Sequence, residues 1–200
     1  MSSAAPLLPG LFYHLFSRGV NREPIYRSDK DYRSFLEKWE HHANQMLDTF
    51  AYCLMGNHFH ALVQIKEDIQ LEGNVVTVSP EMASQAIGNC LNAYAKSFNN
   101  KNQRTGSLFE RPFKRVPIKD EGHLLTVIPY IHQNPAKHGF VADFRDWPWS
   151  SYWDLLAKTP TLLNRPDCLA WFGGRQPFIA SHHYVNGAAD TAEWAIDDWE

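Results

Sequence analysis

Cysteine is scarce in this 200-residue chain: Cys53, Cys90 and Cys168 are far apart and form no CxxC pair. This spacing argues against a disulfide framework and against a cysteine zinc site, so we expect three reduced, buried thiols. Long apolar runs are missing too, since none approaches the roughly 18 to 20 residues of a membrane span. The opening MSSAAPLLPG lacks the basic start and long apolar middle of a signal peptide. We therefore expect a cytoplasmic protein without a membrane partner.

An overall positive charge is also missing, because the formal net charge is -3 at pH 7. Such a balance usually argues against a nucleic-acid partner, but the charge is spread unevenly. Residues 1–142 carry 15 Lys and Arg against 13 acids, whereas residues 143–200 carry 4 against 9. Within the first region, segment 101–119 holds six basic residues and one acid. This segment could follow a phosphate backbone, or it could be a solvated loop.

Hydrophobic residues make up 44% of the chain, enough for one well-buried core. We expect residues 1–142 to form the main domain and residues 143–200 to form an acidic extension packed on it. The extension is rich in tryptophan, with Trp147, Trp149, Trp153, Trp171, Trp194 and Trp199.

Hydrophobic periodicity predicts the order strand, helix, strand, strand, helix, strand. The expected strands are 11–20, 49–55, 58–65 and 113–118, and the expected helices are 28–47, capped by Ser28 or Asp29, and 80–98, with Pro80 in its first turn. Residues 66–80 are polar and predicted to be irregular. A short helix through Ile128 is expected after Asp120. This order is typical of an α+β fold with a ferredoxin-like βαββαβ antiparallel sheet, helices on one face and additional C-terminal helices.

The strand 58–65 begins with the unusual sequence His-Phe-His. Successive side chains on a strand alternate between its faces, so His58 and His60 point to one side and Phe59 to the other. Two imidazoles at this spacing can bind one divalent ion, but they can equally be two half-exposed histidines on a solvent-facing sheet. A metal site needs at least a third ligand.

The segment IPYIHQNPAKHGF, residues 128–140, offers candidates for that ligand. Tyr130 and Asn134 are four residues apart and share one face if the segment is helical. Tyr130 could act as a nucleophile toward phosphorus, and Asn134 could complete the metal site through its side-chain oxygen. In the alternative interpretation, Tyr130 is a core aromatic residue and Asn134 ends the helix before Pro135.

The segments YHLFSRGVNREPIY, YCLMGNHFHALVQ, RTGSLFERPFKR, YIHQNPAKHGF and WPWSSY occur in this order. Their combination resembles the REP-associated tyrosine transposases, a group within the single-tyrosine HUH transposases, where HUH denotes His, a hydrophobic residue and His. The resemblance covers about residues 11 to 155. It implies that residues 1–142 form a ferredoxin-like catalytic domain that cuts and rejoins single-stranded DNA next to a hairpin, through a 5′-phosphotyrosine intermediate.

The resemblance also implies roles for individual residues. His58 and His60 match the metal-binding pair, Tyr130 the nucleophile, and Asn134 the polar residue that supplies the third ligand. The expected cofactor is a divalent metal, Mg²⁺ or Mn²⁺, and the expected partner is single-stranded DNA with a hairpin. The resembled group suggests a monomer that contains its own active site. Candidate DNA-binding residues are Arg18, Arg22, Arg111, Lys114 and Arg115, whereas we interpret Arg104 as a solvated surface charge.

Three further residues lie near the motifs. Pro129 directly precedes Tyr130, which predicts a kink or a new helix starting there. His132, two residues from Tyr130, is interpreted as structural or DNA-contacting rather than catalytic. His14 could approach the site if the first and third strands are neighbours, but we favour a packing role. Two other functions stay open: a hairpin-binding or single-stranded-DNA-binding module that no longer cuts, and a metal hydrolase without a covalent step.

Overall fold

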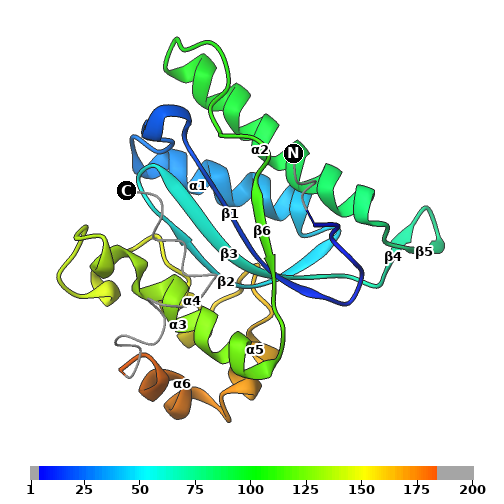
Figure 1. The fold of residues 1–200 in the computed structure, drawn as a ribbon, viewed down its shortest axis with the longest axis vertical. Helices are drawn as coiled ribbons and strands as arrows, with labels where there is room; N and C mark the ends of the chain where they lie inside the picture. Colours follow the sequence, from blue (N-terminus) through cyan, green and yellow to red (C-terminus); the bar gives the residue numbers. More distant parts are fainter. Residues whose placement is uncertain (1–4, 184–200) are drawn as a thin grey trace.

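The structure is a computed structural model that describes residues 5–183 of the chain. The strands are β1 (Phe12–Arg18), β2 (Leu47–Leu54), β3 (His58–Ile65), β4 (Asp68–Leu71), β5 (Asn74–Thr77) and β6 (Lys114–Pro117). The α-helices are α1 (Asp29–Lys38), α2 (Pro80–Lys101), α3 (Glu121–Lys137), α4 (Tyr152–Leu156), α5 (Arg165–Trp171) and α6 (Arg175–Ser181) (Figure 1). Shorter helical turns span Val20–Arg22, Trp39–Ala43 and Phe144–Asp146.

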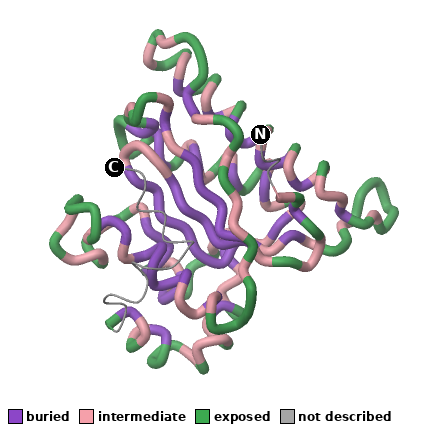
Figure 2. Tube along the Cα trace, viewed as in Figure 1, coloured by how far each residue is buried: buried purple, intermediate pink, exposed green. Residues whose placement is uncertain are grey.

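The main sheet has the strand order β2-β3-β1-β6, and all neighbouring strands are antiparallel. The first and third strands of the βαββαβ unit therefore lie side by side at its centre, which confirms the predicted ferredoxin-like α+β fold. The hairpin between β2 and β3 closes at Gly56-Asn57, as predicted, with the Met55 N–H donating to the His58 carbonyl at 2.8 Å. Figure 2 shows the buried strands running through the middle of the molecule.

Helices cover both faces of this sheet (Figure 1). On one face, α1 and α2 pack as predicted, and the Phe59 ring lies 5.1 Å from Phe35 of α1. On the other face lies α3, where the Tyr130 ring is 6.1 Å from the ring of His60. The alternation of β3 thus buries Phe59 in the core beneath α1 and directs His60 toward α3.

The helix after Asp120 is longer than predicted. Asp120 caps it, since its carboxylate accepts the His123 N–H at 2.8 Å. The predicted short helix ended near Ile128, but α3 continues as one helix through Pro129 and Pro135 to Lys137. Each proline removes one hydrogen bond, and burial of this part of α3 against the sheet outweighs that loss. Tyr130 and Asn134 therefore belong to one helix, and no new helix begins at Pro129.

Two further predictions about local structure were wrong. Residues 66–80 are not irregular, because β4 and β5 form a separate two-stranded hairpin. Its turn has positive φ angles at Glu72 (50°) and Gly73 (80°), and its strands are mostly exposed, so no apolar alternation marked them in the sequence. The first helix also changes form, since α1 ends at Lys38 and a π-helical turn follows over Trp39–Ala43.

The described part of the C-terminal extension, residues 143–183, packs along β2. The Trp171 ring stacks on Phe50 of β2 at 4.6 Å. Main-chain bridges also join β2 to the extension, as between Cys53 and Ser150. Trp194 and Trp199 lie outside the described residues, and the division of the chain at residue 142 stays a prediction.

The three cysteines are free thiols and buried, as the sequence predicted. Burial raises the pKa of the Cys90 and Cys168 thiols to about 12, so both stay protonated at neutral pH. Among the residues that the structure describes, no helix combines the length and the apolar character needed to cross a membrane.

Candidate active site

Three histidines gather on the face of the sheet that α3 covers. His58 and His60 project from β3 with ring centroids 5.2 Å apart. His14 projects from the neighbouring strand β1, where it pairs with Leu62 and lies diagonally across from His60. The rings of His14 and His60 stack at 5.1 Å, and the His14 Nε2 lies 2.9 Å from the His60 Nδ1. We call His14, His58 and His60 the site histidines.

Helix α3 crosses the site histidines with one of its faces. Tyr130 lies over them, with its ring 6.1 Å from His60 and 6.0 Å from His14. Two turns further on, the ring of His138 is 5.6 Å from that of His58. Asn134 follows Tyr130 by four residues, so the helix places the two side chains on the same face of α3. The structure thus places Tyr130 beside His60, with His58 next to His60 and Asn134 one turn from Tyr130 on α3.

The side-chain oxygen of Asn134 has no hydrogen-bond partner although it is buried. Its amide Nδ2 donates to the Tyr130 carbonyl at 2.8 Å, which holds the side chain in place and leaves the oxygen without a donor. A buried polar atom without a partner costs about 1 to 3 kcal/mol, so native proteins rarely keep one without a function. An oxygen in this position fits the third ligand of a divalent ion.

The hydrogen bonds of the two β3 histidines fit the same interpretation. The His58 Nδ1 bonds to the Asn57 side-chain oxygen at 2.7 Å, and the His60 Nδ1 bonds to His14. Both bonds leave Nε2 as the ring nitrogen that could bind a metal, as is usual where a second group orients a histidine ligand. Within residues 5–183, no group of three His, Cys, Asp or Glu side chains could hold a metal ion.

Burial keeps the site histidines neutral. It lowers the pKa of His14 and of His58 to about 3, and charge on His123 and on His138, respectively, adds to the effect. The pKa of His60 is lowered well below its usual value by burial and by the neighbouring His14 and His58. A neutral imidazole is the form of histidine that can bind a metal.

His132 lies on the other side of α3 in a separate group of buried side chains. Its Nδ1 lies 2.8 Å from the His182 Nε2, and its Nε2 lies 2.8 Å from the Ser151 hydroxyl. The His182 Nδ1 in turn lies 2.8 Å from the Phe178 carbonyl. We call His132, Ser151 and His182 the relay. This placement agrees with a structural role for His132.

Two neighbours of the site were not predicted as functional residues. His14 was expected to approach the site if the first and third strands were neighbours, but a packing role was favoured. The two strands are neighbours, and His14 hydrogen-bonds His60. His138 was overlooked, although it follows Tyr130 by eight residues and Asn134 by four, which is helical spacing. Lys137 also approaches, with its Nζ 5.4 Å from the centre of the Tyr130 ring.

The candidate DNA-binding residues occupy several environments. Arg18, at the end of β1, pairs with Glu110 at 2.8 Å, whereas Arg22 and Lys114 are exposed. Arg115 is half-buried, stacks on Phe113 at 4.1 Å and donates to the Ser84 hydroxyl. Arg104 is not a solvated charge as predicted, because it is half-buried and pairs with Glu23 at 2.9 Å.

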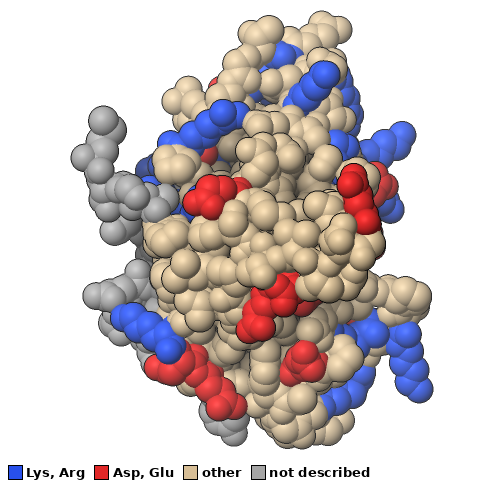
Figure 3. Space-filling view, turned by 90° about the vertical axis from the view of Figure 1, so that its right-hand side faces the viewer, with Lys and Arg blue, Asp and Glu red and all other residues tan. Residues whose placement is uncertain are grey.

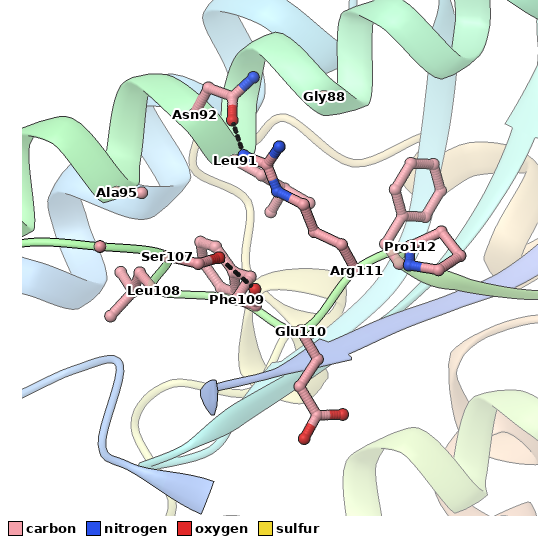
Figure 4. Close-up of a pocket in the computed structure, with 12 residues that line it drawn as sticks. Gly88, Leu91, Asn92, Ala95, Ser107, Leu108, Phe109, Glu110, Arg111 and Pro112 are labelled. Atoms are coloured by element: carbon pink, nitrogen blue, oxygen red, sulfur yellow. Dashed lines mark hydrogen bonds between the residues drawn. The ribbon is translucent and has the colours of Figure 1, made fainter. Parts of the chain in front are cut away.

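Arg111 lies beside a cavity of about 440 Å³ between α2 and segment 106–113 (Figure 4). Its guanidinium donates to the Asn92 side-chain oxygen on α2 at 2.6 Å. Figure 3 shows one face on which Lys and Arg side chains lie at the top and along the right-hand edge, with Asp and Glu across the middle. The basic residues on this face are therefore mixed with acids rather than joined in one continuous patch.

Comparisons with known proteins agree with the motifs. No family model matches the chain. A Haemophilus influenzae protein described as a REP-associated tyrosine transposase is 29% identical over 138 residues, covering 66% of this chain and 74% of that protein. A solved structure described as a REP-associated tyrosine transposase bound to a REP hairpin matches with a TM-score of 0.57 at 17% identity, covering 80% of this chain and 88% of the other. The first match confirms the predicted resemblance, and the second confirms the fold.

Proposed function

We propose that this chain, a relative of the REP-associated tyrosine transposases, cuts and rejoins single-stranded DNA beside a hairpin and so carries out DNA transposition. The observation that supports the proposal is the approach of the Tyr130 ring on α3 to the His60 ring on β3, with His58 beside His60. Asn134 lies one helical turn from Tyr130, and its buried oxygen has no hydrogen-bond partner. In this proposal residues 1–142 are the catalytic domain and residues 143–200 an extension packed on it.

The reaction begins with attack of the Tyr130 hydroxyl oxygen on the phosphorus of a DNA phosphodiester. A bond forms from that oxygen to phosphorus, and the bond from phosphorus to the 3′ oxygen breaks. The phenol loses a proton and the departing 3′ oxygen gains one, so the products are a 5′-phosphotyrosine and a free 3′-OH. Attack by a 3′-OH of another strand reverses these bond changes and joins the DNA without a further energy source.

His58, His60 and Asn134 would hold a divalent metal, Mg²⁺ or Mn²⁺. When bound, the metal supplies charge neutralisation at a phosphate oxygen and polarises the bond that breaks. Lys137 adds positive charge next to Tyr130 and favours the phenolate that attacks. The backbone of α3 fixes the positions of Tyr130 and Asn134 relative to each other, so attack and ligation can use the same geometry.

We further propose that the exposed basic side chains bind the DNA backbone. Arg22, Arg111 and Lys114 are the strongest candidates, because each has an exposed side chain. Arg18 and Arg115 are also retained as candidates, although each is only half-exposed. We propose a cytoplasmic monomer that contains its complete active site.

A covalent-adduct assay tests the proposed function. A hairpin oligonucleotide with a single-stranded flank, labelled at its 3′ end, is incubated with the protein and Mn²⁺ or Mg²⁺. We expect the label to become attached to Tyr130, and Tyr130→Phe to reduce adduct formation by roughly a thousandfold or more. Tyr152→Phe is the matched control, because Tyr152 is a buried tyrosine next to the relay. Its adduct should form as in the unmodified protein.

Two other outcomes would replace the proposal. Cleavage that persists in Tyr130→Phe with free release of both fragments would indicate a metal hydrolase. Hairpin binding without cleavage, unaffected by metal or by Tyr130→Phe, would indicate a binding module derived from a transposase.

A second assay compares the salt dependence of DNA binding. Lys114→Ala should reduce the slope of log affinity against log salt concentration by about 1, and Arg104→Ala should leave that slope unchanged.

A further inference from the structure

We infer that His14 is a positioning residue whose Nε2 accepts a hydrogen bond from the Nδ1–H of His60 and thereby leaves the His60 Nε2 able to bind a metal. This inference rests on the proposed function, since it assigns a role at the same site. It concerns a residue on β1 that lies outside the His-Phe-His motif.

His14 and His60 form a contact between two buried imidazoles. His14 and His60 are almost completely buried, and their ring nitrogens are 2.9 Å apart. At that distance one nitrogen must donate a hydrogen and the other must accept it. Water cannot take over either role where the two side chains are buried. The hydrogen bond between His14 and His60 therefore runs in one of two directions.

The two directions of this hydrogen bond differ in whether the His60 Nε2 keeps a lone pair for a metal. If the His14 Nε2–H donates, His60 carries its own hydrogen on Nε2, and that nitrogen has no lone pair for a metal. If the His60 Nδ1–H donates, the lone pair of its Nε2 remains for a ligand bond. Only the second direction is compatible with a metal at the site. His14 then carries its hydrogen on Nδ1.

His58, like His60, has a hydrogen-bond partner at its Nδ1. The Nδ1 of His58 lies 2.7 Å from the side-chain oxygen of Asn57, and that oxygen can only accept. His58 therefore has its hydrogen on Nδ1 whether or not a metal is present. The Asn57 amide Nδ2 donates to the Arg22 carbonyl at 3.3 Å, which fixes the orientation of the amide. Both β3 histidines are thus held at Nδ1 by a neighbour.

Packing alone does not explain why position 14 is a histidine. The His14 Nδ1 is buried and has no hydrogen-bond partner, which costs about 1 to 3 kcal/mol. An apolar residue such as the neighbouring Phe16, whose ring lies 5.7 Å from His60, would fill space without this cost. The imidazole supplies what Phe16 cannot, an acceptor for the His60 Nδ1–H.

The test measures binding of Mn²⁺ alone to the full chain by calorimetry or by electron paramagnetic resonance. His14→Leu removes the acceptor, and we expect it to weaken Mn²⁺ binding by about 10- to 100-fold. His14→Gln places an amide oxygen where Nε2 was, and it should bind Mn²⁺ within about threefold of the unmodified protein. Phe16→Leu is the matched control, since it alters packing against the same ring without removing an acceptor. It should bind Mn²⁺ as the unmodified protein does.

Nitrogen NMR of the unmodified protein gives a second readout that needs no variant. In the metal-free, ¹⁵N-histidine-labelled chain, His60 should be protonated at Nδ1 and not at Nε2, and the His14 Nε2 should carry no proton. Protonation at Nε2 would overturn the inference, and so would unchanged Mn²⁺ affinity in a folded His14→Leu protein. If His14→Leu does not fold, the NMR result decides alone.

The two proposals fail in different ways. Tyr130→Phe should bind Mn²⁺ normally, because the phenol is not among the proposed ligands. Absence of a covalent adduct, with the His14 effect on Mn²⁺ binding intact, would remove the proposed reaction but keep the role of His14. An adduct at Tyr130 with no effect of His14→Leu would do the reverse.

Discussion

The two sides of helix α3 carry two groups of buried histidines that differ in how completely their atoms are paired. In the relay, the Phe178 carbonyl can only accept, so His182 donates from Nδ1 and His132 donates from Nδ1 to the His182 Nε2. The Ser151 hydroxyl donates to the remaining nitrogen of His132 and accepts the Tyr52 N–H at 2.8 Å. Every polar atom of the relay side chains is paired within the protein.

The site histidines present the opposite case. The His14 Nδ1 and the nearby Asn134 oxygen are buried without partners. Burial lowers the pKa of the histidines in both groups, so neither burial nor pKa separates them. What separates them is hydrogen-bond satisfaction: the relay is complete without a ligand, and the site is not. We therefore expect the relay to determine stability and the site to determine metal binding.

The largest effect should come from breaking the relay. His132→Leu leaves the Ser151 O–H without an acceptor and the His182 Nε2 without a donor, so we expect the free energy of unfolding to fall by about 2 to 5 kcal/mol. Urea denaturation measures this change. The exposed His41 is the control, since His41→Leu should change stability by no more than about 0.5 kcal/mol. Loss of Mn²⁺ affinity without loss of stability in His132→Leu would contradict the comparison.

Acid should destabilise the folded protein as a second large effect. Burial lowers the pKa of His182 to about 4, below the usual value of 6.5. Between these values the unfolded chain binds a proton that the folded chain does not, so stability present above pH 6.5 is lost as the pH falls toward 4. Each such histidine contributes a slope of up to about 1.4 kcal/mol per pH unit.

Urea denaturation at several pH values between 6.5 and 5 measures this slope, above the range in which most carboxylates titrate. The slope should be shallower in His132→Leu, because one buried histidine is removed from both states. An equal slope in the two proteins would show that His132 is not held neutral in the folded state.

Removing the amide on the site side should affect metal binding and spare stability. Asn134→Leu should weaken Mn²⁺ binding by about a hundredfold, which corresponds to about 2.7 kcal/mol. Its stability should not fall by more than about 1 kcal/mol, because removal of the unpartnered Asn134 oxygen offsets the loss of the Nδ2 hydrogen bond to the Tyr130 carbonyl. Calorimetric titration with Mn²⁺ and urea denaturation measure the two effects. The exposed Asn92 is the control, and Asn92→Leu should leave the Mn²⁺ affinity unchanged.

The smallest effect is expected at the edge of the site. His138 is exposed at the end of α3, although its ring is near that of His58. His138→Ala should change stability by no more than about 0.5 kcal/mol and Mn²⁺ affinity by no more than about threefold. The same two measurements apply. A loss of Mn²⁺ affinity as large as that of Asn134→Leu would make His138 a ligand and extend the site to the end of the helix.

Much of the fold was predictable because its signals are local. Alternation on β3 placed Phe59 in the core and His58 with His60 on the opposite face, and Gly56-Asn57 marked the hairpin. The β4–β5 hairpin was missed because exposed strands carry no apolar alternation. The continuation of α3 was missed because the cost of Pro129 is local, whereas the burial that offsets it comes from the sheet.

The sequence by itself determined which residues could take part in the chemistry: the strand period set the common face of His58 and His60, and the helical period set that of Tyr130 and Asn134. Only the tertiary structure decided that these two faces meet. It also decided that His14 joins the site while His132, two residues from Tyr130, does not, because pairing between strands and packing of α3 depend on contacts between distant segments. Those contacts also determine whether both ring nitrogens of a buried histidine have hydrogen-bond partners, and no local sequence pattern predicts this.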